Sequence, residues 1–115
     1  MSEIFDLAKK ICKAAADKKA EDIITMDMRG LMFSTDYFVI CSANTATQVR
    51  AIADNIEDEL AKENIHFSHK EGYHEGEWIL MDYGDVVAHI FKTANRDYYA
   101  LEKLWGDAKI ENYTE

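Results

Sequence analysis

The sequence predicts a single α/β domain, built from a mixed sheet of about five strands with helices packed on it. The chain has 115 residues, which is enough for one hydrophobic core. Amphipathic helical segments alternate with short runs that are rich in β-branched and aromatic residues, as in α/β proteins. The sequence contains no proline, and no repeat or linker interrupts it, so residues 1–115 are expected to form one domain.

Composition narrows the class of protein. Hydrophobic residues make up 48% of the chain and charged residues 30%, which is typical of a globular protein. No apolar run approaches the roughly 20 residues of a membrane span. The first residues, MSEIFD, carry acids where a signal peptide carries basic residues. We therefore expect a cytoplasmic protein that does not bind a membrane, with Cys12 and Cys41 as buried, reduced thiols.

The net charge of −9 argues against nucleic-acid binding through phosphates, which needs clustered lysines and arginines. Lysines cluster in one part of the sequence, where the acidic residues Asp17, Glu21 and Asp22 partly offset their charge. The clustered lysines are Lys9, Lys10, Lys13, Lys18 and Lys19. We interpret this concentration as a solvated helix face. The charge predicts no direct DNA binding and favours a basic protein partner, which an acidic domain attracts electrostatically.

The first third of the chain predicts one helix and two strands. Residues 2–17 are expected to form an amphipathic helix with Ser2 as its N-cap. Its apolar residues follow the i, i+3, i+4, i+7 spacing and are Ile4, Leu7, Ala8, Ile11, Cys12 and Ala15. A strand is predicted over 23–28. The run YFVIC at 37–41 is continuously apolar, which is typical of a strand buried on both faces.

A second helix is predicted to begin at Thr45 and to end near Asn64. Thr45 and Gln48 fit a capping box, in which each side chain binds a free backbone N–H of the first turn. A short strand over 65–69 follows this helix. Strand, helix and strand in this order form a crossover unit, which is expected to join parallel strands with a right-handed connection.

The stretch GEWILMDYGDVVAHIF at 76–91 is predicted to form an antiparallel hairpin. We take Tyr83-Gly84 as a two-residue turn, with Gly84 at a position of positive φ. Counting outward from this turn places Asp82 opposite Asp85. Because side chains alternate along a strand, the hairpin has one mixed face and one apolar face. The mixed face has Trp78, Leu80, Asp82, Asp85, Val87 and His89, and the apolar face has Ile79, Met81, Val86, Ala88 and Ile90.

A last helix is predicted from Asn95 to Trp105, with Gly106 as its stop. Tyr98, Leu101 and Trp105 share one face of this helix. Aromatic residues at this spacing are ordinary core candidates. So many large rings on one short terminal helix would also extend an exposed interaction surface.

The mixed face of the hairpin allows two interpretations. Like charges that lie opposite each other cost roughly 0.2–1 kcal/mol. The ordinary explanation is that both aspartates solvate the hairpin tip or accept N–H groups of the turn. The functional explanation is that the face binds a partner protein, with a Trp as the aromatic anchor within a charged rim. The partner-binding residues that we predict are Trp78, Leu80, Asp82, Tyr83, Asp85, Tyr98 and Leu101.

A catalytic interpretation has less support. Asp82 and Asp85 are carboxylates of the kind that hold a divalent metal, but no Gly-rich phosphate loop accompanies them. His66 and His69 are three apart on a predicted strand, so they point to opposite faces and do not share a metal ion. We therefore expect no enzyme activity, no metal site and no cofactor.

Several segments match a known family in the family's own order. They are TDYFVIC at 35–41, QVRAIA at 48–53, EG at 71–72, WILMDYGDVVAHIF at 78–91 and YYALEKLWGDA at 98–108. On these segments the chain resembles the ribosomal silencing factor family, RsfS, also called the Iojap family. The match covers nearly the whole chain, and the last two segments together are highly specific.

The resemblance implies a factor without a reaction. Such a factor binds the large ribosomal subunit on ribosomal protein L fourteen, where the small subunit must join, and silences translation when nutrients are short. It implies a homodimer in the free state and a fold distantly similar to nucleotidyltransferases. Asp82 and Asp85 are three apart, so the Asp-x-Asp pattern of active nucleotidyltransferases is missing. A nucleotidyltransferase-like enzyme that uses both with a divalent metal is the alternative.

Overall fold

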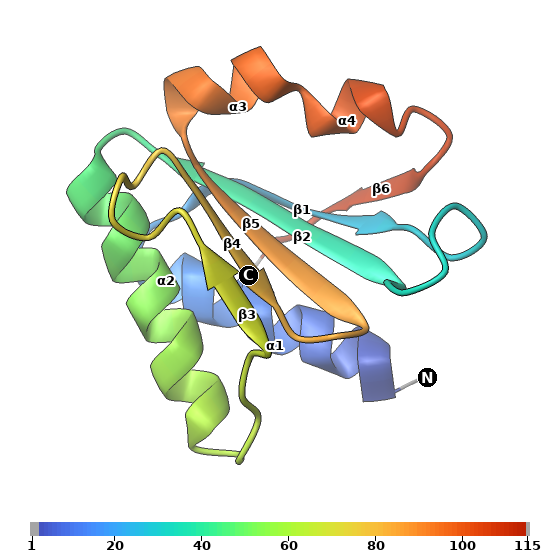
Figure 1. Ribbon diagram of the computed structural model, residues 1–115, viewed down its shortest axis with the longest axis horizontal. Coiled ribbons are helices and arrows are strands. Elements are labelled where there is room, and N and C mark those ends of the chain that lie inside the picture. Colours follow the sequence, from blue (N-terminus) through green and yellow to red (C-terminus); the bar gives the residue numbers. More distant parts are fainter. Residues whose placement is uncertain (1–2, 115) are drawn as a thin grey trace.

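A six-stranded mixed sheet lies between two layers of helices (Figure 1). The computed structural model describes residues 3–114, apart from the side chains of Glu3, Tyr98 and Tyr99. The helices are α1 (Glu3–Asp17), α2 (Ala46–Ala61), α3 (Thr93–Tyr99) and α4 (Leu101–Leu104). The strands are β1 (Glu21–Asp27), β2 (Tyr37–Ala43), β3 (His69–Glu71), β4 (Trp78–Asp82), β5 (Val86–Lys92) and β6 (Lys109–Asn112). The prediction of one mixed α/β sheet is confirmed, with six strands where about five were expected.

The strands lie in the order β3-β4-β5-β2-β1-β6. β2 and β5 pair in parallel, and every other neighbouring pair is antiparallel. β3 therefore runs in the same direction as β2, as predicted for a crossover unit, but β4 and β5 lie between them. β2 has an inner position and is buried along its whole length, as its continuous apolar run predicted.

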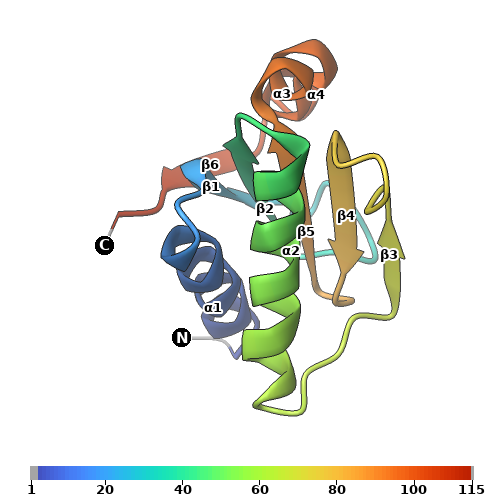
Figure 2. The same ribbon diagram turned by 90° about the vertical axis from the view of Figure 1, so that its left-hand side faces the viewer.

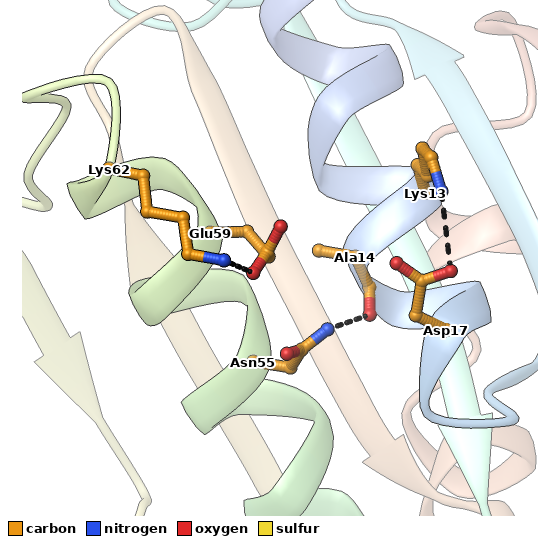
Figure 3. A network of polar contacts seen from close by, with 6 residues as sticks. All are labelled: Lys13, Ala14, Asp17, Asn55, Glu59 and Lys62. Atoms are coloured by element: carbon orange, nitrogen blue, oxygen red, sulfur yellow. Dashed lines mark hydrogen bonds and ion pairs between the residues drawn. The ribbon is translucent and has the colours of Figure 1, made fainter.

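The two long helices cover one face of the sheet (Figure 2). The apolar stripe of α2 is fully buried against this face, and its members are Val49, Ile52, Ala53, Ile56 and Leu60. Burial of a large aliphatic side chain contributes about 1.5–3 kcal/mol each, so this stripe fixes α2 on the sheet. The Asn55 side chain donates a hydrogen bond of 2.8 Å to the Ala14 carbonyl oxygen and joins α2 to α1 (Figure 3).

The short helices α3 and α4 lie over the other face (Figure 1). The predicted helix from Asn95 to Trp105 is wrong in one respect, because the chain breaks at Ala100, which has a left-handed backbone with φ 47° and ψ 51°. Such a backbone costs a non-glycine residue roughly 1–2 kcal/mol. Two contacts favour the break: Leu101 becomes buried, and Arg96 on α3 bonds Glu102 on α4 at 2.8 Å.

Other details of the elements also differ from the sequence prediction. The predicted strand over 65–69 is instead the shorter β3, which begins at His69. Half of the capping box forms: the Thr45 side chain accepts the Gln48 N–H at 3.1 Å, but the Gln48 side chain donates to the Lys18 carbonyl oxygen. The predicted N-cap, Ser2, lies outside the described residues. Nothing in the sequence singled out β6, whose residues are all exposed.

Both cysteines are buried free thiols, as predicted. Burial raises the pKa of Cys12 and of Cys41 to about 12, so both thiols are protonated and poor nucleophiles at neutral pH. Among the described residues, none of the helices has the length and apolarity that crossing a membrane requires.

Candidate protein-binding face

The register of the β4–β5 hairpin differs from the predicted one by two residues. Asp82 lies opposite Val87, not Asp85, and Trp78 lies opposite Phe91. The ladder continues past Asp82, because the Tyr83 N–H donates to the Val86 carbonyl oxygen at 2.9 Å. The tight turn is therefore formed by Gly84 and the residue after it, and Gly84 has the expected positive φ of 88°.

The predicted carboxylate pair does not form in this register. The Asp82 side chain turns back and accepts the Gly84 N–H at 2.7 Å, which is the ordinary role of an Asp before a turn. Asp85 is exposed in the turn itself. The apparent clash of like charges was a consequence of the wrong turn assignment.

The two faces of the hairpin are nevertheless those that the sequence predicted. A register shift of two residues moves no side chain to the other face, because the side-chain period of a strand is two. Ile79 and Met81 are sealed in the core beneath α1 and α2. Trp78, Leu80 and Asp82 lie on the opposite face and are half-buried.

Trp78 is held by a network of aromatic rings. Its indole stacks on the Phe91 ring with 5.0 Å between centroids. The indole Nε1–H donates a hydrogen bond of 3.0 Å to Nδ1 of His89. His89 in turn meets the edge of Phe38 at 4.5 Å. The indole is thus fixed in place while part of it stays open to solvent, which is the arrangement of a preorganised binding anchor.

His89 is neutral in this network. Because Nδ1 accepts the Trp78 bond, the ring proton is on Nε2, which is buried and has no hydrogen-bond partner among the described residues. Burial lowers the pKa of His89 to about 4, since a charged imidazolium has no compensating partner here. The buried imidazole therefore acts as a fixed acceptor for the indole rather than as a proton donor or base at neutral pH.

Two residues of β3 extend the face that Trp78 and Leu80 begin. His69 lies opposite Asp82 and Glu71 lies opposite Leu80, so both share this side of the sheet. Their side chains bond each other at 2.6 Å. α3 packs on β5 and β2, and Figure 2 shows β4 and β3 to the side of the short helices. The result is an apolar centre with an acidic rim, which we call the β4 face: Trp78, Leu80, Asp82, His69 and Glu71.

The structure does not bring all predicted partner-binding residues to the β4 face. Tyr83 points to the opposite side, where its ring meets Phe67 at 6.3 Å and burial raises the pKa of its hydroxyl to about 12. Leu101, the first residue of α4, is buried in the core that Trp78 borders. Tyr98 lies on α3, but its side chain is outside the described part of the chain. Asp85 stands at the hairpin tip.

Sequence reasoning missed several exposed apolar residues. Leu104 on α4 is 69% exposed, and Phe33, in the loop between β1 and β2, is fully exposed. His69 and Glu71 were also missed, because the predicted strand ended where β3 begins. The residues at 69–71 read HKE and are all polar, so no apolar–polar alternation marks this strand in the sequence. No periodic pattern marks a single exposed aromatic residue in a loop.

The two aspartates that suggested a metal site do not face each other in the structure. No three His, Cys, Asp or Glu side chains among them gather closely enough to hold a metal ion. The Asp82 carboxylate is already engaged by the turn. What the β4 face offers is an aromatic and aliphatic surface with charges around it, and such a surface suits protein recognition.

Comparisons with known proteins give one consistent result. A family model described as "Ribosomal silencing factor during starvation", RsfS, matches residues 2–115. The ribosomal silencing factor RsfS of Bacillus subtilis is 48% identical over 106 residues, which cover 89% of this chain and 90% of that protein. The chloroplastic Iojap protein of Zea mays is 33% identical over 93% of this chain and 46% of that protein. A crystal structure of a protein from Chromobacterium violaceum superposes with a TM-score of 0.89 at 33% identity, covering 99% of this chain and 95% of that one.

Proposed function

The chain belongs to the ribosomal silencing factor family, RsfS, and from this membership and its β4 face we propose that it binds the large ribosomal subunit and keeps the small subunit from joining. It acts by occupying space at the subunit interface, without a chemical reaction. The docking point is ribosomal protein L fourteen. The consequence for the cell is repression of translation when nutrients are short.

One observation supports this proposal most directly: Trp78 is fixed by Phe91 and His89 yet remains half open beside Leu80. A domain of this size is large enough to bury a Trp completely, as it buries Phe91 on the neighbouring strand. A preorganised aromatic residue at the centre of an apolar patch is the usual content of a binding hot spot.

The charges around the β4 face fit a basic partner. Asp82 and Glu71 lie along its rim, Asp85 stands at the hairpin tip, and the chain as a whole carries a net charge of −9. Opposite charges on the two partners speed their encounter and orient it, while the apolar centre supplies most of the affinity. A ribosomal protein that is rich in Lys and Arg meets this requirement.

Purified protein added to separated ribosomal subunits tests the proposal. We expect the yield of joined ribosomes at low magnesium to fall as the protein concentration rises, and the protein to migrate with free large subunits on a sucrose gradient. A normal yield of joined ribosomes at saturating protein would contradict a steric block. Nucleotide turnover by the parent protein that is lost in Asp82→Ala would instead favour the nucleotidyltransferase alternative.

Free copies of the protein are proposed to form a homodimer through the same β4 face. An apolar patch left open in the free protein favours self-association, and one patch does not hold two occupants at once. Light scattering is then expected to show a dimer that dissociates when the ribosomal partner is added. A complex with two copies on each large subunit would argue against this shared use.

A further inference from the structure

The surface between α1 and the C-terminal strand is a groove that differs in charge from the rest of the molecule. Three adjoining hollows form it, of about 330, 460 and 630 Å³. The first lies between Phe5 and β1, β2 and β6, and the second between the middle of α1 and residues 112–114. The third lies between the end of α1 and the same C-terminal residues, and Figure 2 shows α1 and β6 on this flank.

Basic side chains line the groove out of proportion to their number in the chain. The lining includes six of the thirteen Lys and Arg residues but three of the 22 Asp and Glu residues. The basic residues are Lys9, Lys10, Lys13, Lys19, Arg29 and Lys109, and the acids are Asp22, Asp27 and Glu111. In a chain of net charge −9, the lining of these three hollows is thus richer in bases than in acids.

Aromatic rings lie at both ends of the basic lining. Phe5 and Tyr37 form a tilted pair with 5.5 Å between centroids, and Arg29 lies 5.3 Å from the Tyr37 ring. Lys9 lies 5.2 Å from the Phe5 ring and joins the first hollow to the second. Tyr113, half-buried, lines the second and third hollows. Rings therefore flank the cations of the groove, which extends over about 18 Å of α1 from Phe5 to its end.

The floor of the first hollow also carries a hydroxyl group, that of Thr25. Thr25 is 8% exposed, lies in the middle of β1 and lines the first hollow. No hydrogen bond of its side chain is found among the described residues.

Existing ion pairs in the groove do not block a ligand. Lys10 bonds Glu63 at 2.5 Å and Lys13 bonds Asp17 at 3.4 Å, with all four side chains at least 43% exposed. Exposed pairs of this kind contribute little stability, so a multiply charged anion competes with them easily. The bidentate pair of Arg29 with Asp27 is firmer, which leaves the lysines of α1 as the principal anion contacts.

The sequence alone led us to interpret the α1 lysines as a solvated helix face, but the fold places them beside β1, β6 and residues 112–114. From this placement we propose that the α1–β6 groove binds a single strand of RNA, with the α1 lysines contacting phosphates and Phe5 and Tyr113 contacting bases. Cations interleaved with aromatic rings along a groove are the common pattern of single-strand binding. A membrane surface fits less well, because the cations line a recess rather than a convex face. The groove lies on the side of the sheet that α1 and α2 cover, away from the β4 face. A failure of this proposal would therefore leave the proposed function untouched.

Fluorescence anisotropy with a labelled single-stranded 12-mer RNA tests the proposal. The parent protein is expected to bind at low salt, with an affinity that falls with salt at a log–log slope of about −2, as about three phosphate contacts require. Lys9→Gln combined with Lys13→Gln is expected to weaken binding about tenfold and to reduce the slope by about 1. Both side chains are exposed, so the melting temperature of this double variant is expected to stay that of the parent.

Matched controls decide whether the groove is the site. Lys62→Gln combined with Lys103→Gln removes the same charge from the C-cap of α2 and from α4, outside the groove, and is expected to bind RNA like the parent. Absence of binding by the parent, or an equal loss in both double variants, would overturn the proposal. Equal binding of a duplex RNA, or equal competition by heparin or anionic vesicles, would overturn the assignment to single-stranded RNA.

Discussion

The two faces of β4 come from alternate residues of one five-residue strand, yet they meet different environments. Ile79 and Met81 have no exposed surface and pack beneath α1 and α2. Trp78 and Leu80 alternate with these two residues along the strand and are half-buried beside the short helices. The sealed face has only aliphatic and thioether groups, whereas the open face has a Trp, a Leu, a hydrogen-bonded His beneath them and carboxylates along the rim.

The difference separates what holds the fold from what is available for recognition. Packing of the sealed side fixes the backbone of an interior strand. The side chains of the open side are attached to the same backbone, so their positions are fixed as well. The position of the β4 face therefore depends on the buried residues of the sealed side, and Phe91 and His89 fix Trp78 from within the open side. Substitutions on the two sides of β4 are expected to give opposite patterns of stability and binding.

The largest effect on stability is expected from Ile79→Ala. Removing a fully buried Ile leaves a cavity under two helices and costs about 2–5 kcal/mol. Chemical denaturation monitored by circular dichroism measures this loss. The protein that remains folded is expected to bind large subunits with the parent's affinity. A loss of less than about 1 kcal/mol would show that the site is not sealed.

The largest effect on binding is expected from Trp78→Ala. Truncating a central aromatic anchor costs roughly 2 kcal/mol or more of binding free energy, about thirtyfold in affinity. Its cost in stability is expected to be smaller than that of Ile79→Ala, because part of the indole is already exposed. Trp78→Phe is the control that keeps the stack on Phe91. Early unfolding of Trp78→Ala with normal binding by the folded fraction would assign Trp78 to the core instead.

The buried His89 predicts a pH dependence of stability. The imidazole pKa is 6.5 in the unfolded chain and about 4 in the folded one, so the unfolded chain binds more protons between these values. The stability that the neutral imidazole allows is present in full above about pH 6.5 and is lost as pH falls toward 4. The free energy of unfolding is expected to have fallen by about 2 kcal/mol at about pH 5. Urea denaturation across this range, compared with His89→Phe, isolates it. The same pH response in both proteins would contradict a buried neutral His89.

The smallest effect is expected from Asp82→Asn. The Asn side-chain oxygen still accepts the Gly84 N–H, so stability is expected to change by less than about 0.5 kcal/mol. Loss of one rim charge slows association with a basic partner, and salt reduces the difference between the two proteins. Stopped-flow binding at two ionic strengths measures the association rate and its dependence on salt. A large loss of stability would mean that the charge itself supports the turn.

Sequence patterns sufficed where local chemistry determines structure. The continuous apolar run at 37–41 gave the buried β2, and the alternation at 78–82 gave both faces of β4. The turn was assigned one residue too early, and this error left the faces intact because the register shift was even.

Elements that depend on distant contacts were not predictable in this way. The break at Ala100 is stabilised by Leu101 burial and by the Arg96–Glu102 bond, and Arg96 also donates to the Asp22 carbonyl oxygen at 2.7 Å. β6 forms because β1 offers it a free edge, although its own residues are polar and exposed. The acceptor role of His89 became visible only when the fold placed its ring beside Trp78.

Binding of Leu80→Arg to large ribosomal subunits tests the account most directly. Leu80 is half-buried on the β4 face, and we expect an Arg side chain at this position to reach solvent. Ile110→Arg is a matched control, because Ile110 is a 42% exposed apolar residue on β6, at the other edge of the sheet. On a sucrose gradient we expect the parent and Ile110→Arg to migrate with large subunits and Leu80→Arg to stay at the top. Co-migration of folded Leu80→Arg at the parent's level would contradict the assignment of the β4 face as the ribosome-binding surface.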